Sequence, residues 1–219
     1  MESPLSDVEV RVLGALLEKE RTTPDNYPLS LNALTSACNQ TSNREPVMSL
    51  EETVVSAAVD QLRKRSLVRA HIHSGGRVTK YGQLIGETMG LVNRQLAVLG
   101  VMMLRGPQTV AELRTRTQRL HEFADMGELE STLEGLIDRA PPLVVRLPRR
   151  PGQREERFAH LLGGPIDLEA LAAREESDER RSPSPSADRL AALEADVASL
   201  RQEVTDLRES LLTFRKQFE

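Results

Sequence analysis

The sequence predicts a mainly α-helical protein with small β-hairpins (α+β), built as two tandem winged-helix domains followed by a C-terminal coiled-coil helix. Three observations support this. One order of elements, three helices and then a hairpin, occurs twice along the 219 residues. Each copy opens with the same signature, Val12-Leu13-Gly14 and Val98-Leu99-Gly100. Near the C-terminus, apolar residues repeat every seven positions, which is typical of a coiled coil.

The first predicted domain comprises residues 1–86. Ser6 and Glu9 have the spacing of a capping box, which predicts a helix that ends near Glu20. Ser30 is placed to cap a short helix that runs through Cys38. A polar loop follows at residues 39–46, and a second capping box at residues 49–52 predicts a third helix as far as residue 65.

A hairpin completes the first domain. From Val68 to His73 apolar and polar residues alternate, which is the period of a half-buried strand. Gly75-Gly76 predicts a tight turn before a returning strand at residues 78–81. Three helices followed by such a hairpin make a winged unit.

The second predicted domain comprises residues 87–165 and repeats this order. Its first helix ends at Gly106-Pro107, and Thr109 and Glu112 form a capping box for the second. Residues 129–137 predict the third helix and residues 143–147 a strand. The hairpin tip is expected at residues 148–152, and Phe158 returns the chain to the core.

The tail divides into a short helix with a charged Ser/Pro linker at residues 166–188 and a coiled-coil dimerisation helix at residues 189–219. Charges beside the apolar seam pair with opposite sign in a parallel, in-register arrangement, so the sequence predicts a parallel homodimer. The alternative is an amphipathic helix that folds back on its own domains. The seam positions are Leu190, Leu193, Val197, Leu200, Val204, Leu207, Leu211, Phe214 and Phe218.

Composition and charge limit the classes of function that the protein can have. Residues 1–166 are almost neutral, while residues 167–219 carry 8 Lys and Arg against 13 Asp and Glu, so a broad basic field is absent. The N-terminus lacks signal-peptide features and no apolar run is long enough for a membrane span, which together predict a cytoplasmic protein without membrane contact. We found no pattern for a catalytic site, a metal site or a cofactor, so the sequence predicts a non-enzymatic protein.

Two sets of arginines are candidates for contact with the phosphates of duplex DNA. One lies on or just after the second helix of the second domain, and the other surrounds the second hairpin. The third helices oppose this interpretation, because their N-terminal turns carry Glu51, Glu52, Glu128 and Glu130, which repel phosphate. The candidates are Arg114, Arg116, Arg119, Arg146, Arg149, Arg150, Arg154 and Arg157.

The loop of the first domain is the most unusual segment. Its polar side chains, Asn39, Gln40, Asn43, Arg44 and Glu45, are candidates for hydrogen bonds to a ligand or a partner. The alternative is that they cap helix ends and hold the loop against the domain. The sequence leaves both interpretations open.

Residues 28–48, 105–117, 121–123 and 150–158 together resemble the hallmark segments of the YceH family, uncharacterised bacterial proteins built as tandem winged helices. The resemblance covers about residues 5–162. It implies the fold but no activity. Two functions are therefore expected: a dimeric DNA-associated regulatory protein, which keeps a slight lead from the usual use of this fold, and a scaffold whose winged helices dock partner proteins.

Overall fold

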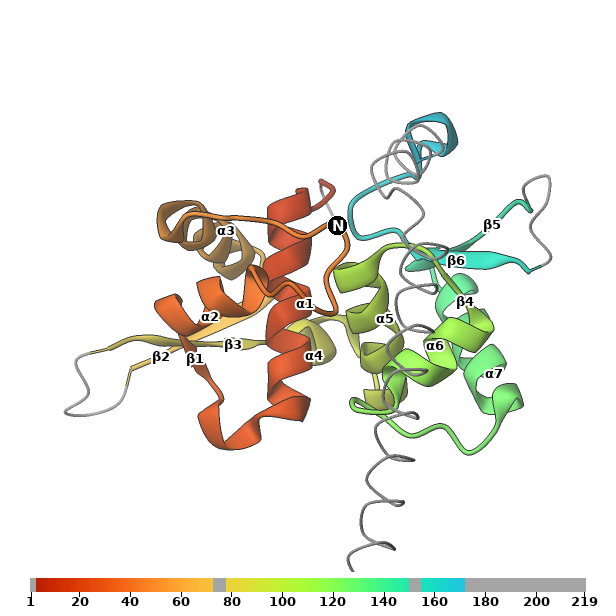
Figure 1. Cartoon of the computed structure of the whole chain (residues 1–219), viewed down its shortest axis with the longest axis horizontal. Helices are drawn as coiled ribbons and strands as arrows, with labels where there is room; N and C mark the ends of the chain where they lie inside the picture. Colours follow the sequence, from red (N-terminus) through yellow and green to blue (C-terminus); the bar gives the residue numbers. More distant parts are fainter. Residues whose placement is uncertain (1–2, 73–77, 150–154, 172–219) are drawn as a thin grey trace, which may run out of the picture. The chain divides into compact units, whose positions relative to one another are not determined.

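Two copies of one helix-and-hairpin arrangement follow one another along the chain in the computed structural model (Figure 1). The structure describes residues 3–72, 78–149 and 155–171. It has two compact units, residues 1–166 and residues 167–219. Within the described residues there are seven α-helices, one 3-10 helix and two antiparallel three-stranded sheets, so the protein is α+β. The predicted linker beyond residue 171 and the seam from Leu190 to Phe218 lie outside the described residues.

The first copy contains three helices and a sheet with strand order β1-β3-β2. Its β3 strand lies in the centre and pairs antiparallel with both neighbours, with Tyr81 opposite Leu29 on one side and Ala70 on the other. The predicted turn Gly75-Gly76 and His73 lie outside the described residues. The elements are α1 (Asp7–Thr22), η1 (Pro24–Asn26), β1 (Leu29–Ser30), α2 (Leu31–Cys38), α3 (Glu52–Lys64), β2 (Val68–His71) and β3 (Lys80–Gln83).

The second copy has the same topology, with strand order β4-β6-β5. Gln108 of β4 lies opposite Phe158 of β6, as Leu29 lies opposite Tyr81 in the first copy. A short helix, α4 (Ile85–Met89), connects the copies. The other elements are α5 (Asn93–Arg105), β4 (Gln108–Thr109), α6 (Val110–Thr117), α7 (Met126–Ile137), β5 (Val144–Leu147) and β6 (Arg157–His160).

Three helix starts confirm the predicted caps. The Ser6 hydroxyl accepts the Glu9 N–H while the Glu9 carboxylate accepts the Ser6 N–H, and Thr109 and Glu112 repeat this exchange. Ser30 likewise accepts the N–H of Ala33. These caps satisfy N–H groups that have no partner inside the helix.

The capping box predicted at residues 49–52 is wrong. Helix α3 starts at Glu52, and Glu51 at its N-cap makes no side-chain capping bond. The preceding Leu50 is held elsewhere, because the Asn39 side-chain amide donates to its carbonyl and accepts its N–H, both at 2.8 Å. A long-range hydrogen-bonded pair therefore replaces the local cap.

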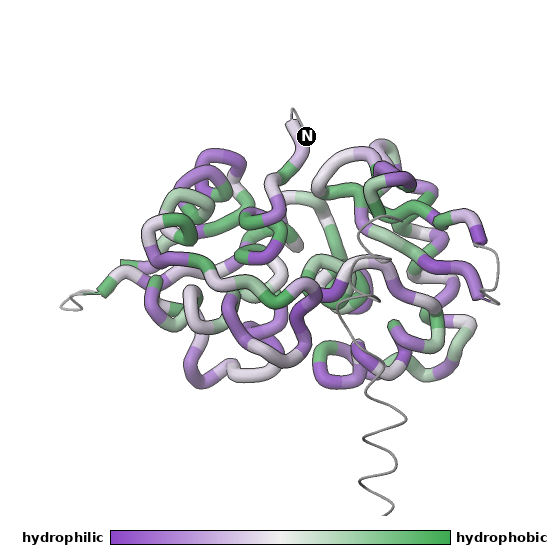
Figure 2. The backbone as a smooth tube through the Cα atoms, turned by 45° about the horizontal axis from the view of Figure 1, so that its top comes forward, coloured by the Kyte–Doolittle hydropathy of each residue, from purple (hydrophilic) through white to green (hydrophobic). Residues whose placement is uncertain are grey.

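Apolar residues of both copies join one hydrophobic core within residues 1–166. Leu34 of α2 and Leu113 of α6 occupy equivalent positions, as the sequence predicts, and both are fully buried. In Figure 2 the tube alternates between hydrophobic and hydrophilic segments, as expected for elements with one buried face. No helix in the described part of the chain combines the length and the apolarity that crossing a bilayer requires.

The repeated Val-Leu-Gly signature marks the contact between the copies. A Cβ atom on Gly14 would lie 3.0 Å from Met103 Cβ, and one on Gly100 would lie 3.6 Å from Leu17 Cβ. Because Leu17 follows Gly14 by three residues and Met103 follows Gly100 by three, the contacts are reciprocal. Helices α1 and α5 thus pack antiparallel, with a glycine of each facing the other helix.

Because of His160 at the end of β6, we expect the folded protein to become less stable in acid. Burial lowers its pKa to about 4, partly offset by Asp7. Its folded-state pKa lies below the ordinary value of about 6.5, so the unfolded chain binds more protons between pH 6.5 and 4, and stability falls as pH falls through this window. We expect His160 to remove about 1–2 kcal/mol of unfolding free energy between pH 7.5 and 5.

Urea unfolding of the wild type and of His160→Gln at both pH values measures this contribution. The variant should lose less stability than the wild type on acidification. His71→Gln serves as the control histidine variant, since His71 lies on β2 of the other sheet. Equal losses in the wild type and in His160→Gln would contradict the prediction.

Candidate binding sites

Two buried arginines hold the polar loop of the first copy against the end of α2. Arg44 has a fully buried side chain that donates to the Ala37 carbonyl at 2.8 Å and to Glu18 Oε2 at 2.7 Å. Arg11 donates to the carbonyls of Cys38 and Pro46 at 3.1 and 2.6 Å. The carbonyls at a helix C-terminus carry partial negative charge and lack partners within the helix, so both guanidinium groups act as a cap.

The remaining loop residues also bind the protein, three through their side chains and Glu45 through its backbone. Asn39 binds the backbone of Leu50, and Gln40 Oε1 accepts from Arg44 Nη2 at 2.9 Å. Asn43, which has a positive φ of 58°, accepts from Arg105 of α5 through its side-chain oxygen. The Glu45 backbone N–H donates to the Leu104 carbonyl at 2.8 Å. Glu45 itself is exposed. The structure thus brings these predicted ligand residues into contacts that tie the loop to α1, α2 and α5.

Cys38 lies inside this arrangement. The thiol is fully buried at the end of α2, and burial raises its pKa to about 12, although Arg44 and Arg11 oppose the rise. A protonated, inaccessible thiol is a poor nucleophile. Cys38 therefore packs as a small apolar residue.

A groove of about 690 Å³ lies in the second copy, between α7, the start of α6 and the β5–β6 hairpin. Arg146 of β5 extends into it over the Phe158 ring, 5.5 Å from the ring centre, and binds Glu134 and Glu156. Arg149 Nε lies 3.5 Å from Glu156 Oε1. Arg146 and Arg149, two of the candidate arginines of this hairpin, are therefore paired with carboxylates.

The described lining of this groove has an acidic balance. Glu130, Glu134, Glu155 and Glu156 outnumber its two arginines. Apolar side chains from α6, α7 and β6 complete the wall, among them Met126, which is 39% exposed. Candidate Arg157 is half-buried on β6 and is not part of the groove lining, and Arg150 and Arg154 lie outside the described residues.

The other candidate arginines lie around α6. Arg116 binds Gln108 and lies 3.1 Å from Glu112, while Arg119 lies 3.3 Å from Glu18 of α1. Together with Arg105 they line a pocket of about 330 Å³ where α1, α5 and the end of α6 meet. Arg114 does not line this pocket, and its Nη1 is buried without a hydrogen-bond partner among the described residues.

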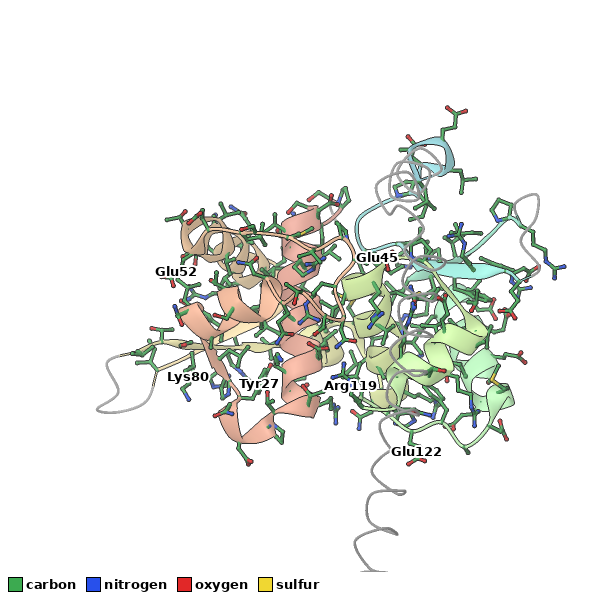
Figure 3. The ribbon with its side chains drawn as sticks, in the orientation of Figure 1. Tyr27, Glu45, Glu52, Lys80, Arg119 and Glu122 are labelled. Atoms are coloured by element: carbon green, nitrogen blue, oxygen red, sulfur yellow. The ribbon has the colours of Figure 1, made fainter. Side chains whose placement is uncertain are left out.

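Arg105 is the functional candidate that the sequence did not indicate. It precedes Gly106 at the end of α5, where a basic residue is explained by the helix terminus alone. Only the packing of α5 against α1 and α6 shows that it faces Arg116 and Arg119. In Figure 3 the Arg119 label lies between α1 and α5, and the Glu45 label lies at the upper end of α5.

These features define a two-repeat α+β protein with one groove at its second hairpin and one arginine-lined pocket between its repeats. The chain belongs to the family described as "Protein of unknown function, DUF480", whose model matches residues 5–153. It is 50% identical to a UPF0502 protein of Pelobacter propionicus and to another of Geobacter sulfurreducens, over the full length of both chains. A UPF0502 protein of Vibrio atlanticus is 49% identical, over 97% of this chain and all of the relative.

Proposed function

We propose that both copies are winged-helix domains and that the protein is a non-enzymatic docking protein. The order of helix, short strand, two helices and hairpin, with the hairpin's returning strand central in the sheet, supports the fold assignment. A partner protein that presents basic and apolar side chains binds the groove between α7 and the β5–β6 hairpin. The main support for this proposal is that glutamates outnumber arginines in the described lining of the groove. Its two arginines, Arg146 and Arg149, are already paired with Glu156.

The same charges weigh against insertion of α7 into a DNA groove. Glu128 and Glu130 lie in its first turns, where a recognition helix approaches base edges, and phosphates would be repelled. Met126 at the helix start adds exposed apolar surface, which suits a protein partner better than a phosphate backbone.

DNA association is the second candidate function. Arg149 and Arg119 favour it, since their side chains are 61% and 56% exposed. Exposed arginines contribute phosphate contacts when several act together, and each contact makes binding more sensitive to salt.

We also propose that residues 189–219 form a parallel coiled-coil homodimer that makes either interaction bivalent. The heptad pattern from Leu190 to Phe218 and its complementary flanking charges support this. Light scattering of the full chain at micromolar concentration should give twice the mass of one chain, and a monomeric mass would refute the dimer.

Photo-crosslinking in the native cells tests the docking proposal. A photoreactive amino acid at position 126 should form a discrete protein adduct. The matched control is position 54 on α3, because Val54 is 43% exposed and belongs to the corresponding helix of the first copy. Glu130→Lys should reduce the adduct at position 126 about fivefold, the effect of losing roughly one ion pair, whereas Glu52→Lys should leave it unchanged.

Fluorescence anisotropy with duplex DNA separates the two functions. If the groove docks protein, micromolar full-length protein leaves the duplex free at low salt. Saturable DNA binding that weakens steeply with salt, together with no protein adduct at position 126, would replace the docking proposal with the DNA one.

A further inference from the structure

The arginine-lined pocket between the two copies is a built concavity, separate from the hairpin groove. It has a volume of about 330 Å³, which is at the lower end of the range for small-molecule sites. Its walls come from α1, α5, the polar loop of the first copy and the end of α6. Segments far apart in the sequence thus converge on one small space.

Three guanidinium groups, those of Arg105, Arg116 and Arg119, line this space. Their described partners leave donors unused: Arg105 binds Asn43 through Nη2, and Arg119 binds Glu18 through Nη2. A guanidinium has five N–H donors in a planar fork. Among the described residues, Arg105 and Arg119 therefore retain N–H groups for a ligand.

The surrounding carboxylates do not fully balance the positive charge. Glu18 already accepts from buried Arg44 as well as from Arg119, and Glu112 pairs with Arg116. Glu45 is the other carboxylate close enough to act on Arg105. The lining itself holds three guanidinium groups and one carboxylate, that of Glu18. When Arg44, Glu45 and Glu112, which interact with these groups from outside the lining, are added, four positive charges stand against three negative charges.

Arg105 shows the effect of this crowding. Its pKa is lowered, first by burial and then by the nearby Arg116, with a further contribution from Arg119. Glu45 and Glu18 oppose the shift. A bound anion would remove the mutual repulsion of these cations, so anion binding is favoured by both charge and geometry.

We propose that this pocket binds the phosphate group of a small phosphorylated molecule. The planar forks of arginine match phosphate oxygens, and charge-assisted hydrogen bonds are the stronger kind. Thr115, Gln118 and Asn43 in the lining offer further polar groups to the remainder of the ligand. Since the pocket walls belong to both copies, an occupied site also stabilises their packing. This inference does not depend on the docking function of the hairpin groove.

Thermal unfolding and calorimetric titration of the full chain test the proposal at constant ionic strength. The probes are inorganic phosphate, adenosine monophosphate, adenosine and a 12-base-pair duplex. Phosphate and adenosine monophosphate should both raise the melting temperature and saturate, whereas adenosine, which lacks the phosphate, should do neither. If the duplex bound saturably while phosphate and adenosine monophosphate did not, the pocket would be a nucleic-acid site and the proposal would be overturned.

Substitutions of the pocket arginines test whether phosphate binds in this pocket. Arg119→Gln should weaken phosphate binding at least about tenfold, because it removes a charge-assisted hydrogen bond to the phosphate. Arg63→Gln is the matched control, since Arg63 is 47% exposed and pairs with Asp60 on α3, outside the pocket. Arg105→Gln is a second test at an independent position. Phosphate affinities that are equal in the wild type, Arg119→Gln and Arg105→Gln would overturn the assignment, as would the absence of saturable phosphate binding.

Discussion

Replacement of Arg44 by methionine is expected to lower the free energy of unfolding by about 3–5 kcal/mol, the usual cost of leaving one member of a buried ion pair without its partner. Within the described part of the chain, Glu18 would keep Arg119 as its one ion-pair partner, and that side chain is 56% exposed and lies 3.3 Å away. The Ala37 carbonyl at the end of α2 would also lose two hydrogen bonds, from Arg44 Nε and Nη2. Methionine fills similar space but replaces neither interaction.

Urea unfolding of the purified full chain measures this loss. Arg63→Met is the control, because it removes an exposed i, i+3 pair with Asp60 and should cost less than about 1 kcal/mol. Glu18→Gln keeps the shape of the pair while removing its negative charge, and the double variant allows a coupling energy to be derived. An Arg44→Met variant as stable as Arg63→Met would show that the loop is not held by this pair.

Alanine at the two signature glycines is expected to change stability in opposite directions. Gly14→Ala should destabilise by about 1–2 kcal/mol, because its new methyl would lie 3.0 Å from Met103 Cβ, an atom that moves only with the α5 backbone. Gly100→Ala should stabilise by up to about 1 kcal/mol, since its nearest neighbour would be 3.6 Å away and alanine favours a helix.

The two glycines are controls for each other, because both lie inside helices and belong to the same repeated motif. Thermal and urea unfolding should therefore show a difference of about 2 kcal/mol between the variants. If both variants stabilise by a similar amount, α1 and α5 do not pack as closely as the structure has them.

Local elements could be predicted because short-range chemistry decides them. Ser6 with Glu9, Ser30, and Thr109 with Glu112 mark helix starts through side chains only three residues from the N–H groups they bind. The same rule failed at α3. There the Leu50 backbone pairs with Asn39, eleven residues earlier, and no local pattern reveals a partner at that separation.

The short strands β1 and β4 and helix α4 were not predicted from the sequence. Strands of two residues are too short to show an alternating pattern, and each depends on pairing with β3 or β6 far along the chain. The prediction of a ligand-binding loop met the same difficulty. Whether Arg44 faces solvent or Glu18 depends on how the loop folds over α1. The residue types in the loop do not determine that packing.

By itself the sequence determined the repeated helix-and-hairpin order, its principal helix caps and the apolar residues that face the core, because these follow from periodicity and local hydrogen bonding. Only the tertiary structure decided which charges meet. It paired Arg146 with Glu134, buried Arg44 against Glu18, and brought Arg105 beside Arg116 and Arg119. The physical reason is that charge acts through space, so the chemistry of a surface depends on the packing of α1 against α5 as well as on the residues present.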